Sequence, residues 1–143
     1  MSDSSRSTYT ATAPFLTLAG ARAVVDAALA ESERIGVPQN VAVVDAGGNL
    51  LAFARGDGAR IASISIAITK AVSAATRKRA TADEGGGDPI ATIRSALAAD
   101  RVTGIGGGIP LVVDGYVVGG VGASSGAIDE DTQVALAGAA ALG

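Results

Sequence analysis

Lys70 is the residue whose type and surroundings most suggest chemistry. It is one of two lysines in 143 residues, and the neighbouring residues Ile66, Ala67, Ser73 and Ala74 are small or apolar. If this helical face is buried, desolvation lowers the pKa of the lysine and suits it to base or Schiff-base chemistry, or to pairing with a ligand carboxylate. A lysine at the margin of a buried stripe, with its ammonium group reaching solvent, explains the same pattern equally well.

Three further charged residues are candidates for a site. Arg55 could hold a carboxylate or a developing oxyanion, and Asp131 could share proton transfer with Lys70. Asp45 completes the candidate catalytic set of Lys70, Asp45 and Asp131. Because Asp45 and Arg55 each stand at an end of a short apolar run, they could instead pair with each other, and we favour this structural ion pair.

One glycine-rich stretch could bring backbone close to a ligand. It consists of Gly106, Gly107 and Gly108. Exposed N–H groups there could bind a carboxylate or an oxyanion. A plain turn explains the stretch equally well.

A second stretch of small residues matches the G-x-S-x-G pattern of a nucleophile elbow, and it spans residues 122–126. The sequence contains no histidine that could activate Ser124. We therefore favour a loop of small residues that lies close to a ligand or to a packed neighbour. In this interpretation Ser124 and Ser125 are ligand contacts.

The composition excludes several classes of function. The chain has no cysteine and no histidine, which removes disulfides, thiolate nucleophiles, the usual metal ligands and serine–histidine–aspartate catalysis. A formal charge of -3 at pH 7 offers no basic footprint for nucleic acid or for an anionic membrane surface. No apolar run approaches the roughly 18 to 20 residues of a membrane span, so we expect a cytoplasmic protein. Because histidine and cysteine are absent, we also expect no metal site.

Apolar periodicity predicts the elements that position these residues. Residues 18–35 have helical spacing, with Thr17 placed to cap the helix and Gly36 to end it. Apolar runs at 41–44 and 50–54, separated by a polar turn, predict a β-hairpin. A second helical face spans residues 61–75.

In the second half of the chain, the predicted helices and hairpins continue to alternate. Residues 80–89 include three consecutive glycines and are predicted to form a mobile loop, followed by a short helix to about Ala99. Asp114-Gly115 separates two apolar runs and is the strongest hairpin signal in the chain. Alanine-rich residues 128–142 predict a last helix with acidic residues in its first turn.

This order of elements predicts one mixed α/β domain over residues 15–143, after a flexible tail at residues 1–14. Hairpins imply antiparallel pairing, and the continuous apolar run 41–44 suggests that helices cover both faces of the sheet. We therefore expect a three-layer α/β/α domain with a sheet of about five antiparallel strands.

Taken in order, these motifs resemble the GlcG/HbpS family, also called the haem-degrading or DUF336 family. The resemblance rests on residues 43–59, Lys70-Ala71, residues 106–115, residues 118–126 and Asp131, and it spans roughly residues 16–142. The ordered series is much more specific than any single piece. It implies a profilin-like α/β/α domain, similar to the domain at the C-terminus of PduO-type cobalamin adenosyltransferases. Homo-oligomers are common in this family, so a homo-oligomer is expected.

The resemblance implies a small-ligand-binding protein of the haem-binding type, with an accessory role in a catabolic or biosynthetic pathway. Haem is the cofactor that it implies, with Tyr116, Lys70 and Arg55 as candidate contacts to the iron or the propionates, since tyrosine ligates iron in some haem proteins. The residues themselves leave two alternatives open. One is a small cofactor-independent lyase, isomerase or hydratase acting on an oxygenated organic acid, with Lys70 and Arg55 in its site. The other is a structural subunit rich in small residues.

Overall fold

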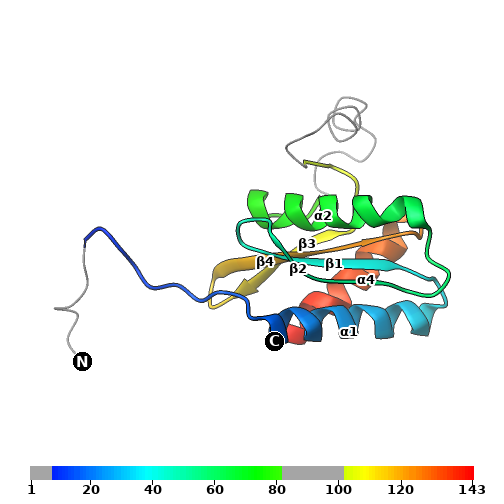
Figure 1. Ribbon diagram of the computed structural model, residues 1–143, viewed down its shortest axis with the longest axis horizontal. Coiled ribbons are helices and arrows are strands. Elements are labelled where there is room, and N and C mark those ends of the chain that lie inside the picture. Colours follow the sequence, from blue (N-terminus) through cyan, green and yellow to red (C-terminus); the bar gives the residue numbers. More distant parts are fainter. Residues whose placement is uncertain (1–7, 82–101) are drawn as a thin grey trace.

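The computed structural model describes residues 8–81 and 102–143 of the chain (Figure 1). Except for residues 80 and 81, the predicted glycine loop and the short helix after it lie outside the described residues. The elements in chain order are α1 (Leu18–Ile35), β1 (Asn40–Asp45), β2 (Leu50–Arg55), η2 (Ile61–Ser63), α2 (Ile64–Arg77), β3 (Gly108–Val113), β4 (Tyr116–Ser124), α4 (Ile128–Ala139) and η4 (Ala140–Leu142).

The strands form one antiparallel sheet in the order β2-β1-β4-β3. Helix α2 packs on one face, and α1 and α4 pack on the other (Figure 1). The predicted mixed α/β class with an antiparallel sheet is confirmed. The prediction of about five strands is wrong for the described residues, which contain four strands, and residues 102–107 ahead of β3 form no strand.

Local sequence signals set the ends of α1 where they were predicted. The Thr17 hydroxyl accepts a 3.1 Å hydrogen bond from the N–H of Gly20, which satisfies a donor that the helix itself cannot pair. Gly36 ends the helix in a left-handed conformation with φ 70°, which a residue without Cβ adopts at little cost.

The sheet separates two hydrophobic cores because both of its faces are covered. Val41 and Val43 of β1 belong to the larger core, which includes residues of α1 and α4. Ala42 and Val44 alternate with them and belong to the smaller core beneath α2. This two-sided burial explains why the run 41–44 is apolar at every position.

Helix α2 lies unusually close to β3 and β4. A Cβ atom built at Gly108, Gly120 or Gly122 would overlap backbone atoms of α2, so only glycine permits this approach. The approach brings Lys70 of α2 deep into the domain, next to the end of β4.

Candidate functional site

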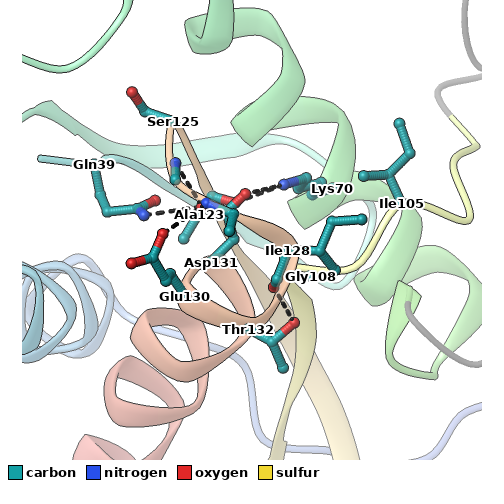
Figure 2. Close-up of polar contacts among 12 residues, drawn as sticks. Gln39, Lys70, Ile105, Gly108, Ala123, Ser125, Ile128, Glu130, Asp131 and Thr132 are labelled. Atoms are coloured by element: carbon teal, nitrogen blue, oxygen red, sulfur yellow. Dashed lines mark hydrogen bonds and ion pairs between the residues drawn. The ribbon is translucent and has the colours of Figure 1, made fainter. Parts of the chain in front are cut away.

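Lys70 and Asp131 form a buried ion pair (Figure 2). The Nζ atom of Lys70 lies 2.9 Å from Oδ2 of Asp131 and 2.9 Å from the carbonyl oxygen of Ala123. Only 1% of Lys70 is exposed. Of the two interpretations of this residue, the structure therefore supports the buried lysine, and the ammonium group does not reach solvent. Because Lys70 comes from α2 and Asp131 from α4, the pair connects helices that cover opposite faces of the sheet.

The second carboxylate oxygen of Asp131 is also paired. Its Oδ1 accepts hydrogen bonds from Nε2 of Gln39, at 2.8 Å, and from the N–H of Gly126, at 2.9 Å. Gln39 is fully buried, and its Oε1 has no hydrogen-bond partner among the described residues. Sequence reasoning missed Gln39, because a lone glutamine ahead of an apolar strand carries no local signal of a partner 92 positions away.

Burial lowers the pKa of Lys70 below its ordinary value of 10.5, and the hydrogen bond and charge of Asp131 oppose this only in part. Two of the three N–H donors of the ammonium group are engaged by Asp131 and Ala123. Lys70 lines neither the pocket that contains Arg55 nor the pocket at the start of α1. Among the described residues, the hydrogen bonds of Lys70 connect α2 with α4 and with the end of β4.

The three candidate glycines 106–108 lie beside this ion pair but are buried. The N–H of Gly108 donates to Oγ1 of Thr81 at 3.0 Å, and the carbonyl oxygen of Gly107 accepts from the N–H of Ala123 at 2.9 Å. The expectation of exposed N–H groups at Gly106, Gly107 and Gly108 is wrong: all three residues are buried, and α2 packs directly against Gly107 and Gly108.

Ser124 and Ser125 lie where β4 ends. Ser124 is buried opposite Asn40 of β1. Ser125 has φ 130°, and its hydroxyl accepts a 3.0 Å hydrogen bond from the N–H of Arg60. The Arg60 guanidinium also donates to the carbonyl oxygen of Ser125 at 3.0 Å, so these contacts tie the segment before α2 to the end of β4.

Asp45 and Arg55 do not pair. In the register of β1 and β2, Arg55 lies opposite Asn40, whereas Asp45 begins the turn at the other end of the hairpin. Oδ1 of Asp45 accepts hydrogen bonds from the N–H groups of Gly47 and Asn49, both at 2.9 Å. The predicted ion pair is wrong because the start of the second strand in a hairpin, and not its end, meets the end of the first strand.

Arg55 lines a pocket of about 470 Å³. The pocket forms where the end of α1 and the following loop meet the end of β2. Its walls combine apolar and charged side chains with backbone: Leu29, Ser32, Glu33, Gly36, Val37, Pro38, Arg55, Gly56 and Asp57. The structure therefore places Arg55 in a concave site, apart from Lys70.

A second pocket, of about 490 Å³, lies at the start of α1 and is mainly apolar. It is lined by Phe15, Leu16, Thr17, Leu18, Asp45, Ala46, Gly47, Leu51 and Val118. Phe15, one of these lining residues, is 81% exposed.

Tyr116 lines neither pocket and is 50% exposed at the start of β4. Ser124 ends the same strand, eight residues or about 26 Å further on. Arg55 lies at the Ser124 end of the sheet, because Asn40 pairs with both of these residues. Tyr116 and Arg55 are therefore not brought together.

The match to known families spans nearly the whole fold. Residues 16–140 match the family described as haem degrading protein HbpS-like. This chain belongs to the HbpS-like family. The predicted resemblance is thereby confirmed.

Other members with similar sequence or structure cover most of the HbpS-like chain. An uncharacterized 15.0 kDa protein from the dhaT-dhaS intergenic region of Citrobacter freundii is 33% identical over 84% of this chain and 87% of its own length. A double mutant of HbpS from Streptomyces reticuli is 33% identical, with a TM-score of 0.82 over 98% of this chain and 95% of its own. A PduOC–haem complex is 30% identical, with a TM-score of 0.78 over 90% and 95% of the two chains.

Within residues 8–81 and 102–143, the HbpS-like chain has no helix of the length and apolar character that a membrane crossing requires. The same residues contain no cluster of three or more acidic side chains arranged to hold a metal ion.

Proposed function

We propose that this HbpS-like chain is a small-ligand-binding protein and that its ligand is an organic carboxylate held in the Arg55 pocket. The observation that carries the proposal is the meeting of apolar walls with a guanidinium group in one concave site. A guanidinium binds a carboxylate through two parallel hydrogen bonds, and a volume of about 470 Å³ is in the range of small-molecule sites. No ion pair joins Arg55 to another residue in the described part of the chain.

The PduOC–haem complex makes haem the first ligand to consider, but the residues that line the two described pockets do not fit a haem held through its iron. The sequence has no histidine or cysteine, and neither pocket is lined by tyrosine, lysine or methionine. The ammonium group of Lys70 is already paired with Asp131. The proposal therefore concerns the carboxylate of a ligand and not a metal.

The proposal is tested by titrating ¹⁵N-labelled protein with hexanoate, which combines a carboxylate with an apolar body. We expect saturable amide shifts at the pocket residues Gly36, Val37 and Gly56. The Arg55→Gln variant should weaken binding about tenfold, and Arg22→Gln, an exposed arginine of α1 that lines neither pocket, should not. Equal binding by the Arg55→Gln variant would move the site elsewhere and overturn the proposal.

A separate titration tests the mismatch with haem. Haemin and metal-free protoporphyrin IX have the same carboxylates, so without an iron ligand they should bind with affinities within about threefold of each other. A saturable Soret shift with haemin that disappears in Tyr116→Phe would show an iron ligand at Tyr116 and overturn this conclusion.

The alternative of a cofactor-independent lyase, isomerase or hydratase stays a prediction. It requires Lys70 and Arg55 in one site, whereas the Arg55 pocket does not include Lys70. The homo-oligomer, the cytoplasmic location and the accessory role in a pathway also stay predictions.

A further inference from the structure

The Arg55 pocket contains charges of both signs. Besides Arg55 it is lined by Glu33, from the last turn of α1, and by Asp57, from the turn after β2. All three residues are exposed. Within the described residues, no hydrogen bond or ion pair engages any of their three side chains. The pocket therefore presents one cation and two carboxylates that have not neutralised one another.

The cation nearest to Glu33 along α1 is already engaged elsewhere. Arg34 forms a two-point contact with Glu31, with Nη2 at 2.9 Å from Oε2 and Nε at 2.5 Å from Oε1. Glu31 also accepts a 2.8 Å hydrogen bond from Gln133 of α4. The Arg34 guanidinium is thus held by Glu31 and does not neutralise Glu33.

Hydrogen bonds fix the backbone that carries the pocket charges. The hydroxyl of Ser32 donates to the carbonyl oxygen of Val37 at 2.6 Å, which ties the end of α1 to the loop that follows. The N–H of Gly56 donates to the carbonyl oxygen of Gln39 at 2.9 Å, which ties the end of β2 to the segment before β1. Glu33 and Asp57 therefore stand on two anchored segments, as preorganised binding groups do.

A ligand with only a carboxylate complements this pocket incompletely. It gains the contact with Arg55 but meets the repulsion of Glu33 and Asp57. We infer that the ligand is zwitterionic, with a carboxylate toward Arg55, an ammonium or amidinium group toward Glu33 and Asp57, and a short apolar body between them. This inference rests on the proposed function and names the ligand class of the same site.

The apolar part of the wall suits the body of such a ligand. Leu29, Val37 and Pro38 contribute hydrocarbon surface to the pocket that also holds the three charges. Burial of methylene groups against this wall would add to the contacts of the two charged ends. An aliphatic or alicyclic amino acid fits this description, whereas a dicarboxylate does not.

The experiment compares hexanoate, hexylammonium and a series of ω-amino acids: 3-aminopropanoate, 4-aminobutanoate and 6-aminohexanoate. We expect at least one amino acid of the series to bind about tenfold more tightly than hexanoate or hexylammonium. Glu33→Gln and Asp57→Asn should each reduce this preference to about threefold or less, without weakening the binding of hexanoate. Asp26→Asn removes an exposed carboxylate of α1 that lines neither pocket and should leave the preference unchanged.

The outcomes separate this inference from the function on which it rests. Arg55-dependent binding of hexanoate, without any preference for an amino acid, would overturn the zwitterionic ligand and leave the carboxylate site standing. A preference that survives in both Glu33→Gln and Asp57→Asn would also overturn it. Absence of binding by every compound of the set would overturn the proposed function itself.

Discussion

Lys70 and Asp131 form a buried 2.9 Å ion pair between α2 and α4, which lie on opposite faces of the sheet. The pair sits beside Gly107, where the chain enters β3. Removing one partner of a buried pair leaves an uncompensated charge, which is more damaging than the loss of a surface contact. The ion pair therefore makes the docking of the two helices interdependent.

Replacing Lys70 by methionine should destabilise the protein by about 3 to 5 kcal/mol. The side chain still fills the space, but the Asp131 carboxylate then stays buried without its cation. Urea unfolding at pH 7 measures the change. Lys78→Met removes the other lysine, which is exposed, and should change the free energy of unfolding by less than about 0.5 kcal/mol.

A double variant separates the charge effect from packing. Lys70→Met combined with Asp131→Asn leaves no charge in the pair, so its loss of stability should be smaller than the sum of the two single losses by at least about 1 kcal/mol. Additive losses would show that the two side chains are not energetically coupled.

The contribution of Lys70 to stability should depend on pH with a defined sign. Burial lowers its pKa below 10.5 in the folded protein, so between the two values the unfolded chain binds more protons at this residue. The contribution of Lys70 to the free energy of unfolding should therefore increase as the pH rises through this window toward 10.5. Subtracting the pH profile of Lys70→Met from that of the wild type isolates the contribution, and a flat or falling difference would contradict the pKa direction.

Gly107→Ala should destabilise the protein more than Gly36→Ala, by at least about 1 kcal/mol. Both glycines have positive φ, at 121° and 70°. A Cβ at Gly107 would lie 2.7 Å from the carbonyl oxygen of Ala123 and 2.9 Å from Nζ of Lys70, whereas a Cβ at Gly36 meets nothing within 4 Å. Thermal or urea unfolding compares them, with Gly36→Ala isolating the cost of backbone conformation. Equal losses of stability would mean that the neighbouring atoms, including Nζ of Lys70, move away from the added methyl group at little cost in free energy.

Glu31 should remain ionised to about pH 2 in the folded protein. The hydrogen bond from Arg34, and next that from Gln133, lowers its pKa from 4.5 to about 2. Its stabilising contribution is therefore present above pH 4.5 and is lost as the pH falls through about 2. An NMR titration of the side-chain carboxyl carbon measures the pKa, which Arg34→Gln should raise toward 4.5. A wild-type midpoint near 4.5 would refute the contact in solution.

Asp45→Ala should cost about 1 kcal/mol of stability, because it removes the acceptor of two turn N–H groups. It should leave hexanoate binding unchanged, since Asp45 does not line the Arg55 pocket. Urea unfolding and the NMR titration measure the two effects. Loss of hexanoate binding in an Asp45→Ala variant that remains folded would show that Asp45 belongs to the binding site.

The helices and strands were largely predictable, because their signals are local. The apolar spacing in residues 18–35 and the Thr17 and Gly36 signals predict α1 at its observed ends. The hairpins follow from turn residues between apolar runs. Hairpin geometry alone excludes the pairing of Asp45 with Arg55, because the two residues lie at opposite ends of the hairpin.

By itself the sequence determined the mixed α/β class, the ends of α1, the approximate positions of the other described elements and the absence of a histidine or cysteine ligand. Only the tertiary structure decided that Lys70 meets Asp131, 61 positions away, and that Arg55 shares a pocket with Glu33. The physical reason is that periodicity reports which face of an element is buried. It does not report which distant side chains meet there, because that depends on strand order, on register and on how closely glycines allow a helix to approach the sheet.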